Sequence, residues 1–436
     1  MSLKQEFLER MKLLLNDKFD SFCEALNQPI QKAIYVNETK ISVDKFKSVI
    51  DFEIEAIEYE QAGFYVDSSK KGRHPLHHAG AFYIQEPSAM FTVNATTFSG
   101  NEKVLDMCAS PGGKSIQIAN RIPNGVLVSN EINKARCETL SSNVERMGLK
   151  NVVVSCDKPE RIAKAYANFF DVCLVDAPCS GEGMFRRGDD VSSQWNAGLE
   201  DLCQERQLEI LEQANKALKQ NGILIYSTCT YSQKENEDVV KLFLEKHNYQ
   251  LQDIKYPHSR GVNMPEVVRL YPHENRGEGQ FVAVLKKLED SDAGLGSSCL
   301  KLQKSKMAKD FLVQHTNLRD DVYEFYDSCF VVNNMPALKK DVNYMRIGVK
   351  IGEMRNKRFE PDHNLFSAFG HEFKIKLELN YADERVKQYL HGDSFNVEIN
   401  DGYGCFMVNG CPLGGFKVIN GMLKNHYPKG LRNFNF

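Results

Sequence analysis

The chain has 436 residues, of which 42% are hydrophobic and 26% charged, and its formal net charge at pH 7 is −3. The composition is ordinary for a globular protein, the length predicts two to four domains, and this charge does not by itself indicate a nucleic-acid partner. No apolar run approaches the roughly 18 residues that a membrane span needs, so we expect no membrane contact.

Twelve cysteines are scattered along the chain without a Cys-x-x-Cys pair. This pattern is typical of neither a zinc site nor a secreted disulfide framework, and we predict no metal site. Free thiols in a chain of this size favour a reducing cytosol. The first residues lack the basic segment and apolar stretch of a secretory signal. We therefore expect a cytoplasmic protein.

The N-terminal part of the chain, residues 1–96, is predicted to be a small α+β domain. Apolar residues recur at helical spacing over residues 3–26, and Pro29 ends that segment. The elements predicted after it are, in chain order, a strand over 33–37, a helix from Val43, a loop over 74–80 and a segment over 82–90 that leads into a helix.

Residues 97–288 alternate between strand and helix patterns, which is typical of a parallel sheet with crossover helices. Strands are predicted over 103–106, 125–130, 151–155, 172–175, 222–227 and 281–285, and helices from near Ser115, Lys134, Leu199 and Lys234. The run Val172-Cys173-Leu174-Val175 is apolar on both faces, as a central parallel strand should be. The predicted fold class is therefore α/β, with a Rossmann-like doubly wound sheet.

The remaining third of the chain is predicted to hold a linker and two further units. Residues 289–305 are polar and rich in glycine and serine, which favours a linker. Residues 306–370 are predicted to form a small mixed domain. Residues 371–436 have short strands and many glycines, which predicts a compact β-rich module with tight turns.

A strand-to-helix loop opens the central segment: Asp106-Met-Cys-Ala-Ser-Pro-Gly-Gly-Lys-Ser115. Its glycines allow a ligand to approach the backbone, and the start of the next helix offers free N–H groups. The glycine order matches neither dinucleotide binders nor phosphate loops, so an ordinary turn is the alternative. The candidate cofactor contacts in this loop are Cys108, Ala109, Ser110, Pro111, Gly112, Gly113 and Lys114.

Acidic residues end the first four strands of the central segment: Asp106, Glu131, Asp157 and Asp176. Each one alone is compatible with an ordinary cap or a solvated charge. Four in register indicate a nucleoside cofactor that offers ribose hydroxyls to Glu131 and an adenine amine to Asp157. S-adenosylmethionine is the leading candidate.

Two cysteines follow apolar strands: Asp176-Ala-Pro-Cys179 and Ser227-Thr-Cys229-Thr230. If these strands are neighbours in a parallel sheet, both thiols lie at the carboxyl edge, where open α/β sheets bind ligands. Two thiols beside the Asp176 carboxylate suggest covalent chemistry on an electrophilic ring. A redox disulfide is the alternative use of the pair. Most buried cysteines are small apolar core residues, and we expect this of Cys108, Cys137, Cys156 and Cys173.

These motifs resemble the NOL1/NOP2/Sun family of RNA cytosine-carbon-5 methyltransferases, and within it the bacterial RsmF type, which modifies 16S ribosomal RNA. The segments that carry the resemblance are 106–115, 176–184 (Asp-Ala-Pro-Cys-Ser-Gly-Glu-Gly-Met) and 226–231, with a weaker likeness over 402–404, 412–415 and 424–432. The resemblance implies a Rossmann-like methyltransferase domain that uses S-adenosylmethionine. It also implies an N-terminal RNA-binding domain and a PUA-like C-terminal RNA-binding domain.

The resemblance assigns roles to Cys229 and Cys179, and the position of Asp176 at a strand end suggests a third role. Cys229 is the nucleophile that adds to carbon 6 of cytosine, which makes carbon 5 enamine-like and replaces one difficult step by two easier ones. Asp176 lies near ring nitrogen 3, where charge builds during the addition. Cys179 assists release of the adduct, either as a base or as a positioning group.

The partner implied is RNA, specifically 16S ribosomal RNA or the small ribosomal subunit. Two alternatives are kept open: a transfer-RNA 5-methylcytosine methyltransferase, and a non-catalytic ribosome-assembly factor that binds RNA. The joint presence of Cys179, Cys229 and Asp176 argues against the second. The sequence leaves the oligomeric state open and is compatible with a monomer.

Overall fold

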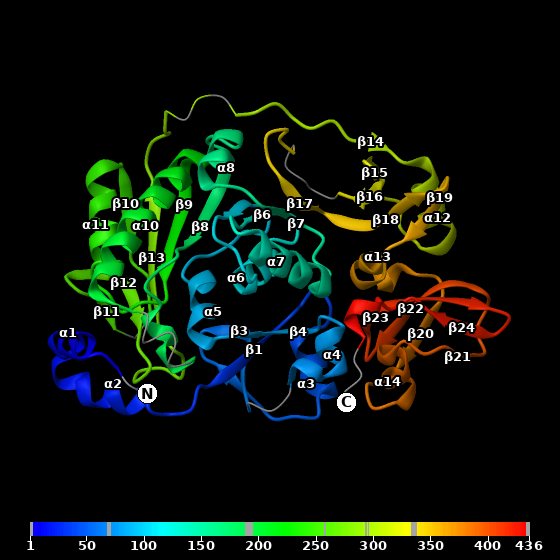
Figure 1. The fold of residues 1–436 in the computed structure, drawn as a ribbon, viewed down its shortest axis with the longest axis horizontal. Helices are drawn as coiled ribbons and strands as arrows, with labels where there is room; N and C mark the ends of the chain where they lie inside the picture. Colours follow the sequence, from blue (N-terminus) through cyan, green and yellow to red (C-terminus); the bar gives the residue numbers. More distant parts are fainter. Residues whose placement is uncertain are drawn as a thin grey trace.

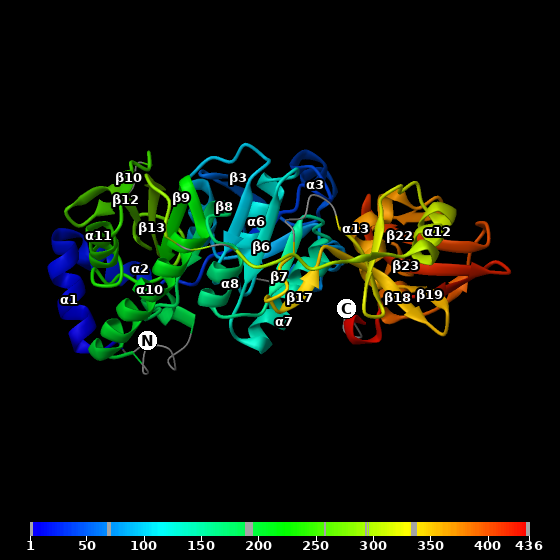
Figure 2. The same cartoon turned by 90° about the horizontal axis from the view of Figure 1, so that it is seen from above.

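The computed structural model describes residues 3–67, 71–187, 195–256, 259–292, 294, 296–332 and 338–432. Residues 1–2 at the start of the chain, and positions 293 and 295 of the predicted linker, lie outside the described residues. The molecule is elongated (Figure 1): α1 and α2 lie at one end, the parallel strands lie in the middle, and the C-terminal sheets lie at the other end. The view from above shows the same order along the long axis (Figure 2).

The N-terminal helical segment is broken where a single helical pattern is predicted. Asn16 has a positive φ of 46°, in a left-handed conformation that asparagine tolerates better than most residues. The chain therefore folds back, and the Phe7 and Phe22 rings meet with centroids 6.5 Å apart. The elements are α1 (Gln5–Leu15), the 3-10 turn η1 (Asn16–Lys18) and α2 (Phe19–Leu26).

A four-stranded antiparallel sheet of order β2-β3-β1-β4 follows. Its elements and their neighbours are β1 (Lys32–Val36), α3 (Val43–Val49), β2 (Ile54–Ile57), β3 (Glu60–Val66), η2 (Lys71–Arg73), α4 (Pro75–His78), β4 (Phe82–Gln85) and α5 (Pro87–Asn94). The loop prediction over 74–80 is wrong for α4. His74 caps this short helix by accepting from the Leu76 N–H, and proline at the first helical position favours the turn.

The central sheet has the strand order β11-β12-β13-β9-β8-β5-β6-β7-β17, with β10 paired to β13. Its strands up to β13 are β5 (Lys103–Asp106), β6 (Val126–Asn130), β7 (Val152–Ser155), β8 (Phe170–Asp176), β9 (Leu218–Thr228), β10 (Tyr249–Gln252), β11 (Arg260–Gly261), β12 (Met264–Leu270) and β13 (Gln280–Lys287). The crossover elements are α6 (Gly113–Arg121), α7 (Lys134–Met147), α8 (Pro159–Ala165), η3 (Glu182–Arg187), α10 (Ala197–Ala217) and α11 (Glu237–Lys246). The five strands β5 to β9 run parallel.

The parallel strands are buried on both faces because their side chains alternate between two cores. Val104 and Leu127 pack in the same apolar cluster as residues of α6, α7 and the N-terminal domain. Their neighbours Leu105 and Val128 pack with residues of α8, α10 and α11 on the other face. The predicted central strand is confirmed, since β8 lies between β5 and β9. The predicted α/β fold class is therefore confirmed.

Strand β17 (Tyr344–Ile347) pairs antiparallel with β7, so a segment from the predicted small mixed domain completes the edge of the central sheet. Strand β14 (Gln303–Lys304) lies in the segment predicted as a linker. The other elements of the predicted mixed domain are α12 (Lys306–His315), β15 (Val322–Phe325), β16 (Ser328–Val331), β18 (Val349–Arg355), β19 (Arg358–Pro361) and α13 (His363–Phe369). Strand β14 and the strands β15, β16, β18 and β19 form a third sheet, of order β14-β15-β16-β18-β19. The exact domain boundaries stay a prediction.

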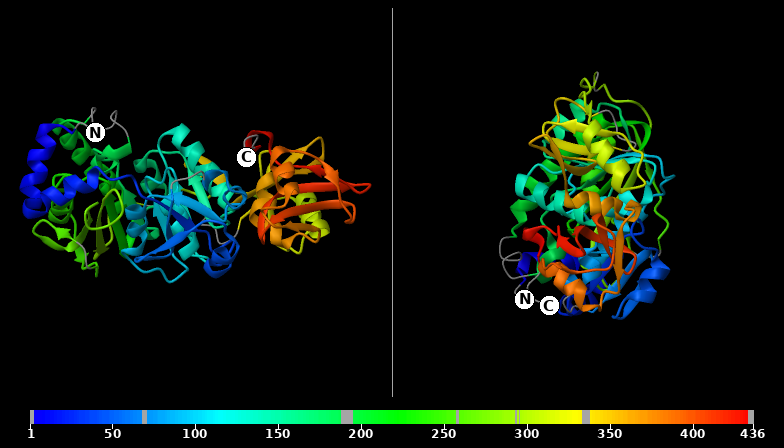
Figure 3. Two further views of the ribbon diagram at one scale, coloured as in Figure 1. Left: turned by 90° about the horizontal axis from the view of Figure 1, so that it is seen from below. Right: turned by 90° about the vertical axis from the view of Figure 1, so that its right-hand side faces the viewer.

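The C-terminal module is a five-stranded sheet of order β20-β22-β23-β24-β21 with one helix. Its elements are η4 (Gly370–Glu372), β20 (Lys376–Leu379), α14 (Glu384–His391), β21 (Phe395–Asn396), β22 (Gly402–Val408), β23 (Cys411–Ile419), β24 (Met422–Asn425) and η5 (Lys429–Leu431). The view from below (Figure 3, left) places this module at the end of the molecule opposite α1 and α2.

Candidate active site

The candidate site lies at the carboxyl edge of the central sheet, where β5, β8 and β9 end. Strands β8 and β9 are parallel neighbours, with Asp176 opposite Ser227. The loops that follow bring the two cysteines together: the Sγ atoms of Cys179 and Cys229 lie 3.4 Å apart. This is the switch-point edge at which doubly wound sheets bind ligands.

A cavity of about 260 Å³ opens at this edge. Among the residues proposed from the sequence, its lining includes Cys108, Ala109, Ser110, Pro111, Gly113, Lys114, Asp176 and Cys229. Asp106, Gly183 and Met184 from the same motifs also line it, as do Gln85 and Glu86 from the segment that leads into α5. Cys229 is therefore one of the residues that line the cavity. Cys179 lies next to Cys229 but does not line the cavity.

The Asp176 carboxylate is held by three donors at the edge of the cavity. Lys114 Nζ donates to its Oδ2 at 2.7 Å, and Ser227 Oγ donates to its Oδ1 at 2.7 Å. Gln280 Nε2 from β13 donates to the same Oδ1 at 3.2 Å. Burial opposes the charge on Lys114, but the ion pair with Asp176 raises the pKa of the ammonium above its usual value. The two side chains therefore form a fixed, charged pair in the cavity wall.

The loop after β5 fits S-adenosylmethionine. Asp106 Oδ2 accepts from Ser115 Oγ at 2.6 Å, while its buried Oδ1 has no hydrogen-bond partner among the described residues. Burial raises the pKa of this carboxyl to about 7. A cationic ligand with amine donors suits such an acceptor. Gly113 packs closely against Gln85 in the cavity wall: a Cβ at position 113 would lie only 3.1 Å from the side-chain Cδ of Gln85.

Glu131 and Asp157 do not belong to the described residues that line the cavity. Glu131 Oε1 accepts from the Asn133 N–H at 2.9 Å, at the start of α7. Asp157 Oδ2 accepts from the Asn343 N–H at 2.7 Å, beside β17. Their predicted contacts with ribose and adenine stay predictions, and so does that of Gly112, which forms the left-handed N-cap of α6 with φ 114°.

The two thiols of the pair differ in their surroundings. The hydrogen bond to Cys229, together with burial, raises the pKa of the Cys179 thiol well above its usual value. Cys179 therefore holds its proton and can donate a hydrogen bond to Cys229 Sγ, 3.4 Å away. Burial also raises the pKa of Cys173, which is a buried core residue as expected; Cys108 is only partly buried and lines the cavity, so the prediction that it is an apolar core residue is wrong.

Further residues in the cavity wall were missed from the sequence, among them Tyr83, Gln280 and Glu278. Glu278 accepts from Arg187 Nε at 2.7 Å, so Arg187, which also lines the cavity, is paired within the protein. The backbone N–H of Glu278 donates to Glu86 Oε1 at 2.7 Å. The polar run Gly277-Glu278-Gly279-Gln280, which leads into an otherwise apolar strand, is the signal that could have indicated Glu278 and Gln280.

In the part of the chain that the structure describes, no group of three or more metal-binding side chains comes together. None of the described helices combines the length and apolar character needed to cross a membrane.

Family models match three parts of the chain. The model described as 16S rRNA methyltransferase RsmB/F matches residues 95–286. That of the N-terminal domain of 16S rRNA methyltransferase RsmF matches residues 3–87, and that of the methyltransferase RsmF PUA domain matches residues 376–433.

Curated relatives align over almost the whole chain. Ribosomal RNA small subunit methyltransferase F of Psychromonas ingrahamii is 29% identical over 98% of this chain and 97% of its own length. The protein of the same name from Salmonella paratyphi A is 30% identical over 95% of this chain and 92% of its own.

Solved structures share the fold over about two thirds of the chain. A methyltransferase homolog from Pyrococcus horikoshii is 27% identical, with a TM-score of 0.57, and covers 66% of this chain and 100% of its own. NSun6 from Pyrococcus horikoshii, solved with SFG, is 22% identical, with a TM-score of 0.59, over 66% of this chain and 99% of its own.

Proposed function

Because the chain belongs to the RsmF type of the Sun family, whose members are S-adenosylmethionine-dependent RNA methyltransferases, we propose that it forms 5-methylcytosine in 16S ribosomal RNA through a covalent adduct at Cys229. The observation that carries this proposal is the thiol pair beside a cavity: the two Sγ atoms lie 3.4 Å apart, and Cys229 and Asp176 line the same wall. A non-catalytic assembly factor would not require this arrangement.

The residues of the site act in a defined order. Cys229 Sγ bonds to carbon 6 of a cytosine that has left its stack, and carbon 5 gains the electron density of an enamine. Asp176, held by Lys114, lies beside ring nitrogen 3 and stabilises that nitrogen in its protonated form, so that the protonated ring takes up the electrons displaced by the addition; the proton comes from solvent and returns to it. S-adenosylmethionine, when bound, supplies an electrophilic methyl group to carbon 5. Loss of the carbon-5 proton and of the carbon–sulfur bond then restores the aromatic ring and the Cys229 thiolate, with assistance from Cys179.

The cofactor is held by the loop after β5. Residues Cys108–Gly113 line the cavity on the side of α6, apart from Gly112. The outer side of the loop is tied to α7, because Asn143 Nδ2 donates to the Pro111 carbonyl at 2.9 Å and Ser110 Oγ donates to the Arg136 carbonyl at 2.9 Å. We assign the orphaned Asp106 oxygen to an amine of the cofactor.

The substrate proposed is 16S ribosomal RNA rather than transfer RNA. Models of both the N-terminal and the PUA domain of RsmF match this chain, and the relatives named small subunit methyltransferase F align from end to end. The test is to incubate the chain with labelled S-adenosylmethionine and, separately, small ribosomal subunits, protein-free 16S RNA and total transfer RNA. Label at carbon 5 of cytosine in the first or second arm is expected. Label confined to transfer RNA would contradict the substrate, and no label in any arm would contradict the activity.

Replacing Asp176 by Asn is expected to lower methyl transfer by about 10²–10³-fold, because the negative charge that stabilises the ring during the addition is removed from the cavity wall. The amide keeps an oxygen for Ser227. Steady-state kinetics on the RNA substrate is the measurement, with Ser227→Ala as the matched control because it removes one hydrogen bond and keeps the carboxylate. Equal rates for the two variants would contradict the role given to Asp176.

A further inference from the structure

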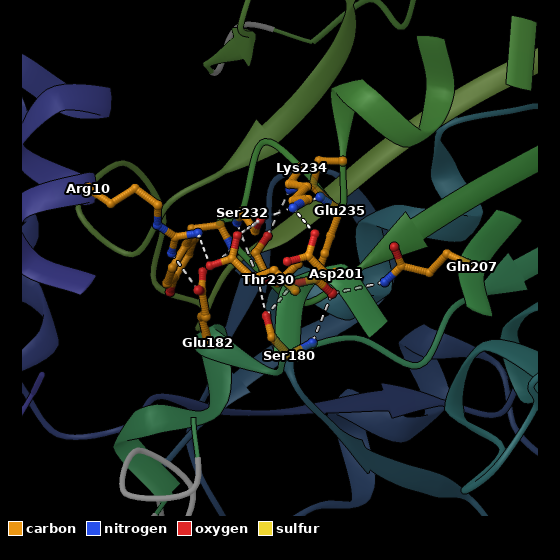
Figure 4. Close-up of polar contacts among 12 residues, drawn as sticks. Arg10, Ser180, Glu182, Asp201, Gln207, Thr230, Ser232, Lys234 and Glu235 are labelled. Atoms are coloured by element: carbon orange, nitrogen blue, oxygen red, sulfur yellow. Dashed lines mark hydrogen bonds and ion pairs between the residues drawn. The ribbon is translucent and has the colours of Figure 1, made fainter. Parts of the chain in front are cut away.

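A network of buried carboxylates lies behind the two cysteine loops and is reached by the N-terminal helix α1. Figure 4 shows Arg10 entering from α1 toward Glu182, while Ser180, Thr230 and Glu235 form a second group of contacts beside it. None of these side chains lines the cavity among the described residues. Their role therefore concerns the loops that carry the thiols rather than contact with a ligand.

Helix α1 docks on those loops through its apolar face. The ring of Phe7 lies 5.1 Å from that of Phe185 and 6.5 Å from that of Tyr231, centroid to centroid. Phe185 lies six residues after Cys179, and Tyr231 lies two residues after Cys229. The helix thus covers the outer side of both loops.

The guanidinium of Arg10 bridges two buried carboxylates. It donates through Nη2 to Glu182 Oε1 and through Nη1 to Glu200 Oε1 at 2.8 Å. The Glu182 side chain is fully buried, and that of Glu200 is 10% exposed. Among the described residues, Arg10 is the one cation that forms an ion pair with either of them. Removing one partner of a buried pair leaves the other charge uncompensated, which is costly.

Both carboxylates in turn hold the segment that follows Cys229. Glu182 Oε2 accepts from the Tyr231 N–H at 3.0 Å, and Glu200 Oε2 accepts from Ser232 Oγ at 2.6 Å. Next to Glu182, the Gly183 N–H donates to the Cys229 carbonyl at 2.8 Å. Arg10 therefore closes a ring of contacts that joins the loop of Cys179 to the loop of Cys229.

A second layer joins the residues that directly follow the two cysteines. The hydroxyls of Ser180 and Thr230 lie 2.8 Å apart, and Glu235 accepts from the Ser180 N–H at 2.9 Å. Gln207 Nε2 from α10 donates to the same Glu235 oxygen at 2.9 Å. This layer depends on neutral donors, so it does not require Arg10.

We propose that Arg10 is a positioning residue for methyl transfer: by binding Glu182 and Glu200 it holds the Cys179 and Cys229 loops in the geometry that sets the thiols side by side. The inference rests on the proposed role of the two thiols. A misplacement of reacting groups by about 1 Å costs about 100-fold in rate. Loss of the Arg10 contacts with Glu182 and Glu200 is therefore expected to lower kcat more than it weakens binding.

The ion pair between Arg10 and Glu182 predicts that the activity of Arg10 variants depends on pH. Burial raises the pKa of Glu182 to about 7, and Arg10 opposes that rise. The other titratable groups that face Glu182 are Glu200 from α10 and Tyr231 from the segment after β9. Without Arg10 the pKa of Glu182 rises further, so the ionised carboxylate that holds the loop forms only at higher pH.

The test compares Arg10→Gln with Arg10→Lys and with Lys12→Gln, a matched loss of one exposed cation from the same helix. Arg10→Gln is expected to lower kcat about 100-fold at pH 7, with KM for S-adenosylmethionine unchanged and with a deficit that shrinks as the pH rises toward 9. Arg10→Lys is expected to recover most of the rate, and Lys12→Gln to match the unmodified chain. The double variant Arg10→Gln with Glu182→Gln carries no charge at either position, and its kcat at pH 7 is expected to exceed that of Arg10→Gln alone.

Two results would overturn the inference. One is a profile of kcat against pH for Arg10→Gln that coincides with that of Lys12→Gln. The other is a loss of kcat in Arg10→Gln that is equal at every pH and is not relieved by Arg10→Lys or by the double variant. That result would mean that Arg10 contributes only to the docking of α1. If Arg10→Gln does not fold, the single variant Glu182→Gln tests the inference. It is expected to remove the change of kcat with pH near pH 7, and a profile that keeps this change would contradict the inference. Failure of the proposed function is separate: the unmodified chain would then transfer no methyl group, or Cys229→Ala would keep its activity.

Discussion

Replacing Cys229 by Ala is expected to abolish methyl transfer, with a loss of roughly 10⁴–10⁶-fold in kcat, as for other enzymes that lose their nucleophile. Of the two neighbouring thiols, Cys229 lines the cavity, and the Cys179 thiol holds its proton, so Cys179 does not replace it. Binding of S-adenosylmethionine should persist, because the loop after β5 is untouched. Incorporation of labelled methyl groups into RNA, alongside calorimetric titration of the cofactor, measures both effects.

The control for this substitution is Cys299→Ala, because Cys299 is exposed and lies outside the central sheet. It tests whether loss of any thiol affects the preparation, and its rate should equal that of the unmodified chain. Turnover in Cys229→Ala that stays within a few-fold of the control would reject Cys229 as the nucleophile.

The sequence predicted the central sheet well because buried parallel strands leave a strong local signal. Runs such as Val126-Leu127-Val128 and Val152-Val153-Val154 are apolar on both faces, and all six predicted strands are present within a few residues. The three family matches confirm the resemblance to the RsmF type and the PUA-like C-terminal domain. S-adenosylmethionine as cofactor is confirmed with them.

Other features depend on contacts between distant segments, which no local pattern records. Strand β17 joins β7 across almost two hundred residues, as Asp157 and Asn343 illustrate with their 2.7 Å hydrogen bond. The same limit applies to Asp157 and Glu131: a carboxylate at a strand end can point to a ligand or to a neighbouring N–H, and its sequence position is the same in both cases.

The candidate site likewise has residues that a local pattern predicted and residues that only long-range contacts bring in. The motifs located Asp176, Cys179 and Cys229, since each lies in a short turn after an apolar strand. They did not indicate Gln280, which reaches Asp176 from the antiparallel strand β13, or Arg10, whose partner Glu182 is 172 residues away. A residue that acts through a long-range ion pair has no spacing signal in its own helix.

Replacing Cys179 by Ala is expected to leave addition and methylation possible while slowing release, so that RNA stays attached to Cys229. After methyl transfer, carbon 5 carries both a methyl group and a proton; a base must take that proton before the electrons can reform the ring bond and expel the Cys229 sulfur. Carbon 5 is bonded to carbon 6, which the Cys229 sulfur attacks, and Cys179 Sγ lies 3.4 Å from that sulfur. Cys179 is therefore the nearest identified group for this step: because its thiol holds its proton in the free enzyme, it acts as the base only after losing that proton to solvent, or it positions the base.

The measurement is an RNA–protein band that survives denaturation in gel electrophoresis. It should require S-adenosylmethionine, resist thiol reductants and be absent in the double variant with Cys229→Ala. Resistance to reductants separates a carbon–sulfur bond from a disulfide, which is the alternative use of two adjacent thiols. A Cys179→Ala chain that turns over at the full rate without the band would remove Cys179 from the reaction. A band that persists without Cys229 would place the attachment at another residue.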